Sequence, residues 1–200
     1  MGEEINKEIV TELLKIKGEA RGVHFKNDGD FVLKEKGKEG IEKLEKELEE
    51  LGCPIKYGKI NQFDFYPAGM RVVSLLAIKK TFDWPDEKIV ELGAYAMQVS
   101  WIIKLFTKYF FSIEKTLKSA PNIWSKYFTI GEIEIEEYNS SKNSVVLKVK
   151  NFNLHPIYCL CLKGVLLGVI RMVVKSQKIT CEETECIFKN NENHKFLIKW

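Results

Sequence analysis

The chain has 200 residues, of which 45% are hydrophobic and 30% are charged, and its formal net charge is +3. This apolar content is enough for one sizeable core and excludes a low-complexity disordered chain. Five cysteines are too few for a disulfide scaffold, and the near balance of charges does not favour a nucleic-acid binder. The charged N-terminus shows no apolar signal segment, so we expect a cytoplasmic protein with reduced thiols.

The N-terminal half of the sequence predicts several helices. Apolar residues recur at helical spacing over residues 5–17 and again over residues 38–51. Between them, the turn signal at residues 27–29 separates two short apolar runs and predicts a small hairpin or an extended loop. A helix is expected over residues 68–81, and Pro85 opens another that runs to Gly93 or continues through residues 95–117. Pro121 is expected in a loop.

The last 70 residues change to a period of two. Residues 132–136 alternate between Glu and Ile, a polar turn follows at residues 139–143, and apolar residues alternate again on the returning strand. A helix over residues 157–175 and strands over 178–189 and 195–200 complete the chain. The sequence therefore predicts an α+β fold with a helix-rich N-terminal half, then an antiparallel sheet of about four strands with helices packed on one side.

The apolar stretch over residues 95–113 has the length of a membrane span. It contains Lys104 and Lys108, so we interpret it as a buried or surface-docking helix, and no membrane span is expected. Its apolar side chains cover more than one helix face: Trp101, Leu105, Phe106, Tyr109, Phe110 and Ile113. Such a helix is buried in the core, lines an apolar ligand pocket or forms a dimer face.

Four cysteines and two histidines fall within the last 46 residues, and their side chains suit tetrahedral zinc. Cys159 and Cys161 are two residues apart on the predicted helix, so they lie on different faces. Cys181 and Cys186 are an odd number apart, so on a regular strand they point to opposite faces. The best predicted metal set is Cys161, Cys186 and His194. His155 or Cys181 is the candidate fourth ligand, and buried structural thiols, redox use or a disulfide are the alternatives.

Gly164 and Gly168 lie one turn apart on the same predicted helix. Glycines at this spacing allow close backbone approach, either to another element of the domain or to a ligand. Both uses stay open from the sequence.

Three C-terminal motifs carry a family resemblance. They are the cysteine- and glycine-containing segment 155–168, the run Glu183, Thr184, Glu185 and Cys186, and the ending around Phe196. Together they resemble the 4-vinyl reductase domain family, although His194 stands near the position of that family's last cysteine. The wider order of elements is similar to small subunits of the TRAPP tethering complex and to haem nitric-oxide-binding sensors. The Tyr-x-Ser-x-Arg motif of those haem sensors is absent from the sequence.

The resemblance implies a single domain over residues 1–200, with an N-terminal helical extension over 1–52 and the motifs within 120–200. It implies a non-enzymatic, small-molecule-binding or sensory domain that pairs as a homodimer. We expect a hydrophobic ligand such as an acyl chain, a hydrocarbon or a tetrapyrrole-like molecule. The predicted ligand-binding residues are Trp101, Leu105, Tyr109, Cys161, Gly164 and Gly168. The alternatives are a Cys/His sensor that binds a metal such as zinc, an accessory factor in tetrapyrrole vinyl reduction, and a TRAPP-like assembly subunit.

Overall fold

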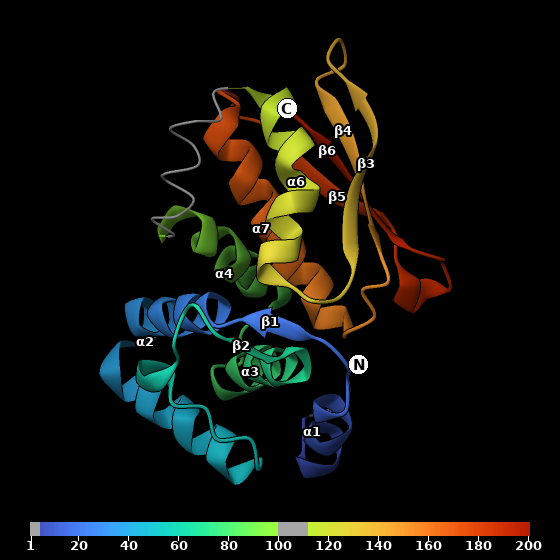
Figure 1. Cartoon of the computed structure of the whole chain (residues 1–200). Helices are drawn as coiled ribbons and strands as arrows, with labels where there is room; N and C mark the ends of the chain where they lie inside the picture. The colour runs from blue at the N-terminus through green and yellow to red at the C-terminus, as the bar shows by residue number, and fades with distance from the viewer. Residues whose placement is uncertain (1–4, 100–111) are drawn as a thin grey trace.

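The computed structural model describes residues 5–99 and 112–200 (Figure 1). The described α-helices are α1 (Lys7–Leu14), α2 (Val23–Glu50), α3 (Ala68–Thr81), α4 (Asp86–Val99), α6 (Ile113–Tyr127) and α7 (Pro156–Val173). The described strands are β1 (Glu19–Arg21), β2 (Phe65–Pro67), β3 (Glu132–Asn139), β4 (Ser144–Lys150), β5 (Thr180–Glu185) and β6 (His194–Lys199). Two short 3₁₀ helices, η1 (Tyr57–Lys59) and η2 (Ile187–Lys189), complete the description.

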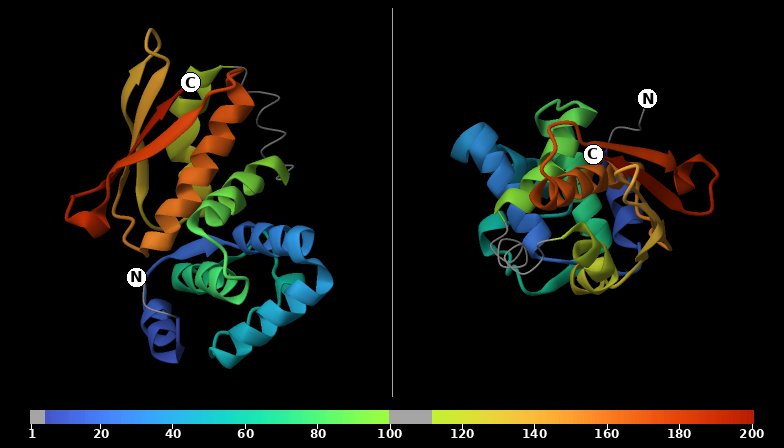
Figure 2. Two further views of the ribbon diagram at one scale, coloured as in Figure 1. Left: turned by 180° about the vertical axis from the view of Figure 1, so that it is seen from behind. Right: turned by 90° about the horizontal axis from the view of Figure 1, so that it is seen from above.

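The C-terminal half is built on a four-stranded antiparallel sheet with the order β3-β4-β6-β5. Helices α6 and α7 lie on one face of this sheet, and α4 packs on α7 (Figures 1 and 2). Strand β4 shows why the sheet forms here, since Val145, Leu147 and Val149 alternate with half-buried residues and enter the core. The predicted α+β fold is confirmed.

The helical N-terminal half shares its core with the sheet-bearing half. Strands β1 and β2 pair in a small antiparallel sheet, and Ala20 of β1 also bridges to Phe128 at the end of α6. Both residues are buried in a hydrophobic cluster that includes residues of every described α-helix. Chain segments about 100 residues apart in the sequence are therefore held together at this point.

The predicted hairpin or loop over residues 22–33 is wrong, because this segment is the first part of α2. Asp28 is fully buried and pairs with Arg71 of α3, and a Cβ on Gly29 would lie only 2.9 Å from the Cβ of Tyr57. These tertiary contacts override the local turn signal. The kink comes later, at Gly37, where a φ of 69° suits glycine and separates two helical stretches.

Pro121 lies inside α6, where the sequence predicted a loop. The helix starts at Ser112, whose side chain accepts a hydrogen bond from the backbone N–H of Lys115. Leu117 and Trp124 are buried on one face and lie on either side of the proline. Core packing of this face therefore maintains the helix across a residue that lacks a backbone donor.

Within residues 5–99 and 112–200, α7 alone has the length and apolar composition of a membrane span, and half of it is buried inside the protein. It contacts α4 on one side and β5 on the other, and a core helix passes the same test. The predicted pocket residues Trp101, Leu105 and Tyr109 lie outside the described residues.

Candidate functional site

A cavity of about 180 Å³ lies among α2, α4, α6, α7 and the sheet. Most of its described lining residues are aliphatic or aromatic, including Trp124 and Phe128 from the α6 end and Leu162 and Leu166 from α7. An apolar cavity of about 150 Å³ in another protein stays dry and binds benzene. This cavity is therefore large enough for a guest of one aromatic ring or a short acyl chain.

One end of the cavity is polar. Arg71, which is 2% exposed, forms two hydrogen bonds with the buried Asp28 carboxylate: its Nε donates to Oδ2 at 2.6 Å and its Nη2 donates to Oδ1 at 2.8 Å. Ser74 donates a third hydrogen bond to Asp28 Oδ2 at 3.1 Å. Arg71 Nη1 is also buried and has no partner among the described residues. A buried donor without a partner costs roughly 1–3 kcal/mol, so this atom needs an explanation.

Asp28 and Arg71 form a buried ion pair whose opposite charges balance. Burial raises the pKa of Asp28 to about 6, and the nearby Arg71 and Ser74 oppose that rise. Burial alone would lower the pKa of Arg71, but Asp28 together with Tyr158 and Cys161 outweighs burial and raises that pKa. At neutral pH both groups are charged and neutralise each other.

His24 lies beside this pair and also lines the cavity. Its ring stacks on Phe128 with centroids 4.8 Å apart, and its Nε2 atom is buried without a described partner. Burial, with a smaller contribution from Arg71, lowers the pKa of His24 well below its usual value. The imidazole is therefore neutral at neutral pH.

Among the predicted ligand-binding residues, Cys161 lines the cavity, and Arg71 Nη2 lies 3.7 Å from its sulfur. Gly164 and Gly168 instead face α4. A Cβ on Gly164 would lie 1.9 Å from the carbonyl oxygen of Val90, and one on Gly168 would lie 2.8 Å from Met97 Cβ. The structure thus places both glycines at a close helix–helix contact and outside the cavity lining, because any side chain there would separate α7 from α4.

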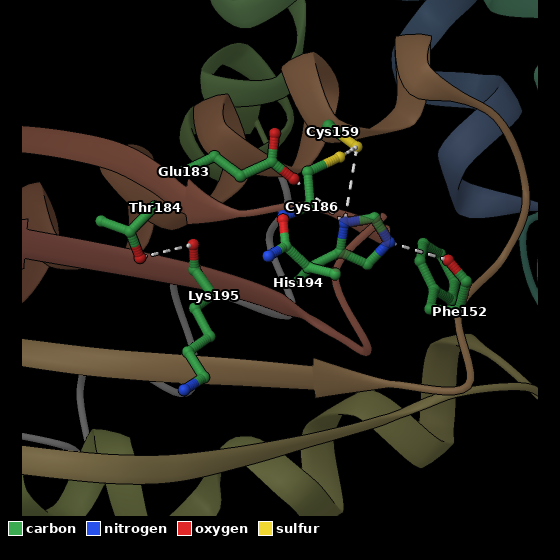
Figure 3. Close-up of polar contacts among 8 residues, drawn as sticks. Phe152, Cys159, Glu183, Thr184, Cys186, His194 and Lys195 are labelled. Carbon is green, nitrogen blue, oxygen red and sulfur yellow. Dashed lines mark hydrogen bonds and ion pairs between the residues drawn. The ribbon is translucent and has the colours of Figure 1, made fainter. Parts of the chain in front are cut away.

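A second group of side chains gathers where α7 meets the ends of β5 and β6 (Figure 3). Its members are Cys159, Glu183, Cys186 and His194, and their ligand atoms all lie within 4.8 Å of one another. Cys159 Sγ is 3.8 Å from Cys186 Sγ and 3.7 Å from His194 Nδ1. His194 Nδ1 is 3.0 Å from Glu183 Oε1. We refer to these four residues as the thiol–imidazole cluster.

The spacing within this cluster resembles that of a tetrahedral metal site. Ligand atoms at usual zinc–sulfur and zinc–nitrogen distances are separated by roughly 3.5–3.8 Å in a tetrahedron. His194 Nε2 lies 3.2 Å from the carbonyl oxygen of Phe152, so a protonated Nε2 can donate to it, and Nδ1 is the ring nitrogen that faces Cys159 and Glu183 and would ligate a metal. Asn191 Oδ1 accepts a hydrogen bond from the backbone N–H of Cys186 and fixes the turn after β5.

The predicted metal set differs from this cluster in two positions. Cys186 and His194 do come together, but Cys159 joins them in place of Cys161, which lies on the other face of α7. His155 caps the start of α7, where its Nδ1 accepts a hydrogen bond from Ile157 N. Cys181 is buried outside the cluster.

Glu183 is a candidate ligand that the sequence did not predict. The register of β5 and β6 shifts between Glu183 and Glu185, and Cys186 lies just beyond the end of β5. This irregularity brings Glu183 and Cys186 to one side although they are three residues apart. Their spacing in the motif was the available signal, but a regular strand would have separated them.

No protein-family model matches this chain, and no curated protein matches it. Solved structures do. The H-NOX protein from S. oneidensis in the Fe(II)NO ligation state has a TM-score of 0.69 at 14% identity and covers 90% of this chain and 98% of its own. The Fe(II) unliganded H-NOX protein from K. algicida has a TM-score of 0.64 at 16% identity, covering 90% and 95%. The chain has the H-NOX fold.

This likeness confirms the fold expected from the resemblance to haem nitric-oxide-binding sensors, while membership of the 4-vinyl reductase family stays a prediction. The described cavity is smaller than most pockets for drug-sized ligands. Its volume of about 180 Å³ lies below the range of roughly 300–1,000 Å³ typical of pockets for drug-sized ligands. The face of the His24 ring is also covered by Phe128.

Proposed function

We propose that this protein is a binding or sensory domain that holds a small apolar molecule in the cavity between α6, α7 and the sheet. The carrying observation is the cavity itself, an apolar space of about 180 Å³ within an otherwise well-packed core. The H-NOX fold supports the proposal, because the solved neighbours are H-NOX proteins described in Fe(II)NO and Fe(II) unliganded states. Of the ligand classes expected from the sequence, a hydrocarbon or short acyl chain matches this volume better than a tetrapyrrole.

Native mass spectrometry of gently purified protein tests this proposal. The expected result is an adduct of low mass on a fraction of the molecules, released by denaturation into organic solvent. Protein that carries no adduct and takes up none when incubated with ethylbenzene would contradict it. An adduct with the mass and absorption spectrum of a tetrapyrrole would show that the cavity opens far beyond its described volume.

A second proposal concerns the thiol–imidazole cluster, which we propose binds one zinc ion within the reducing cytoplasm. Four ligand atoms within 4.8 Å and the hydrogen bond of His194 to Phe152 favour it. Burial, followed by the nearby Glu183 and Cys186, raises the pKa of the Cys159 thiol. A bound cation would reverse this effect, because a coordinating thiol is deprotonated.

Helix α7 offers a matched pair of variants for the zinc proposal. Elemental analysis of protein purified without chelator should give about one zinc per chain, and Cys159→Ser should reduce this content at least tenfold. Cys161→Ser should leave it unchanged, because that thiol faces the cavity on the same helix. Equal zinc loss in both variants, or no zinc in the unmodified protein, would contradict the proposal.

A further inference from the structure

The cavity has one polar end whose chemistry narrows the class of guest, and this inference rests on the proposed function. Arg71 is the only charged side chain among the described residues that line the cavity. Three of its contacts are already made: two hydrogen bonds to Asp28 and one approach to the sulfur of Cys161. Its remaining group, Nη1, is buried and unpartnered among the described residues.

The unpartnered Nη1 is a donor, so the group that completes it must be an acceptor. Guanidinium nitrogens carry only N–H donors and cannot be deprotonated in proteins. The neighbouring polar side chains on the cavity wall are His24 and Asn27, and Tyr158 lies under the guanidinium with its ring centroid 5.7 Å from Arg71 Cζ. Of these three, Tyr158 shares a side-chain hydrogen bond with Arg71, and Nη1 itself has no described partner.

The charge balance at this end favours a neutral guest over an anion. The Asp28 carboxylate already neutralises the guanidinium through a bidentate pair with almost no exposure to water. His24 is neutral, so it offers no second positive charge. A guest carboxylate would therefore place two anions around one buried cation, in surroundings where an uncompensated charge is strongly disfavoured.

We propose that the cavity takes an uncharged apolar molecule, about the size of a single aromatic ring, that carries one carbonyl oxygen, and that Arg71 Nη1 donates a hydrogen bond to this oxygen. The apolar wall buries the body of the guest, and the guanidinium fixes its orientation. Small-molecule sites usually combine an apolar lining with a few polar groups that provide specificity.

Three probes of similar shape test the proposal by titration calorimetry at neutral pH: acetophenone, ethylbenzene and benzoate. We expect acetophenone to bind at least about tenfold more tightly than ethylbenzene, since hydrogen bonds to charged groups are the stronger ones. Benzoate should bind more weakly than acetophenone. Equal binding of acetophenone and ethylbenzene would overturn this inference and leave the proposed function intact, and tightest binding of benzoate would overturn the neutral-guest argument. Failure of all three probes would overturn both proposals.

The infrared carbonyl band of bound acetophenone provides a second readout. Donation from Arg71 should shift this band to lower frequency than in a hydrocarbon solvent, and an unshifted band would contradict the assignment. A double variant, Asp28→Leu with Arg71→Met, removes the donor without leaving a buried unpaired charge, a replacement that protein cores often tolerate. In this variant the affinity ratio of acetophenone to ethylbenzene should fall to about one. If the double variant does not fold, the infrared band of the unmodified protein still decides the question.

Discussion

Helix α7 places two cysteines in two different surroundings. Cys159 lies among an imidazole, a carboxylate and a second thiol at the end of the sheet, whereas Cys161 lines an apolar cavity with a guanidinium near its sulfur. Burial raises the pKa of both thiols, but for Cys161 the neighbouring Arg71 opposes this rise and the pKa is about 11. The same residue type thus serves a candidate metal site on one face and a cavity wall on the other, and helical phase alone decides which.

The separation of the two faces depends on how closely α7 is held against α4. Gly164→Ala would place a Cβ 1.9 Å from the backbone carbonyl oxygen of Val90, so the two helices would have to move apart. We expect a loss of unfolding free energy of about 1–3 kcal/mol or more, as for other overpacked sites. Urea denaturation measures this loss.

Gly58→Ala is the matched control for that experiment. A Cβ at Gly58 meets nothing within 4 Å, and its backbone does not require glycine. Its unfolding free energy should stay within about 0.5 kcal/mol of the unmodified protein. Equal destabilisation by the two variants would show that α7 and α4 are not in close contact, and the assignment of the two faces would fail with it.

A smaller effect concerns the cavity face alone. His24 is neutral in the folded state and its pKa is lowered, while the unfolded chain takes up a proton near the ordinary value of 6.5. The unfolded state therefore binds more protons as the pH falls below about 6.5, and the folded protein loses stability there by up to about 1.4 kcal/mol per pH unit. Above about pH 6.5 His24 is neutral in both states, so it causes no loss of folding stability there.

Replacement of His24 by Phe should flatten this dependence between about pH 6.5 and pH 5. The buried Asp28, whose pKa is raised to about 6, gives the opposite slope between about pH 4 and pH 6, because there the folded state binds more protons. Asp28 is present in both proteins, so the difference between the two stability curves isolates His24. Parallel curves over this range would mean that His24 is exposed to water.

Local sequence patterns predicted elements where local rules decide. The helix over residues 68–81 and the turn between β3 and β4 lie where periodicity and turn residues placed them. Local patterns gave wrong predictions where distant contacts determine the structure. Asp28 pairs with Arg71, which is 43 residues away, and the segment around Asp28 is a helix where the sequence predicted a hairpin or loop. The prediction of a loop at Pro121 was wrong for the same reason, since burial of Leu117 and Trp124 maintains α6 across this residue.

The sequence predicted the residue types of the candidate sites, but it did not predict which particular residues come together. The rule that Cys159 and Cys161 lie on different helix faces holds in the structure. The choice between them depends on the rotation of α7 against the sheet, which no local pattern encodes. Glu183 joins Cys186 only because the register of β5 shifts there, and the polar end of the cavity required the pairing of α2 with α3.

The most direct test of the central claim is a crystal structure under xenon pressure, because xenon enters dry apolar cavities of this size. Xenon density is expected among Trp124, Leu162 and Leu166 in the unmodified protein and in Ser119→Phe, whose position lies outside the cavity lining. No such density is expected in Ala120→Phe, where the new ring fills the space. Side chains that close this space in the unmodified crystal, with no xenon bound, would contradict it.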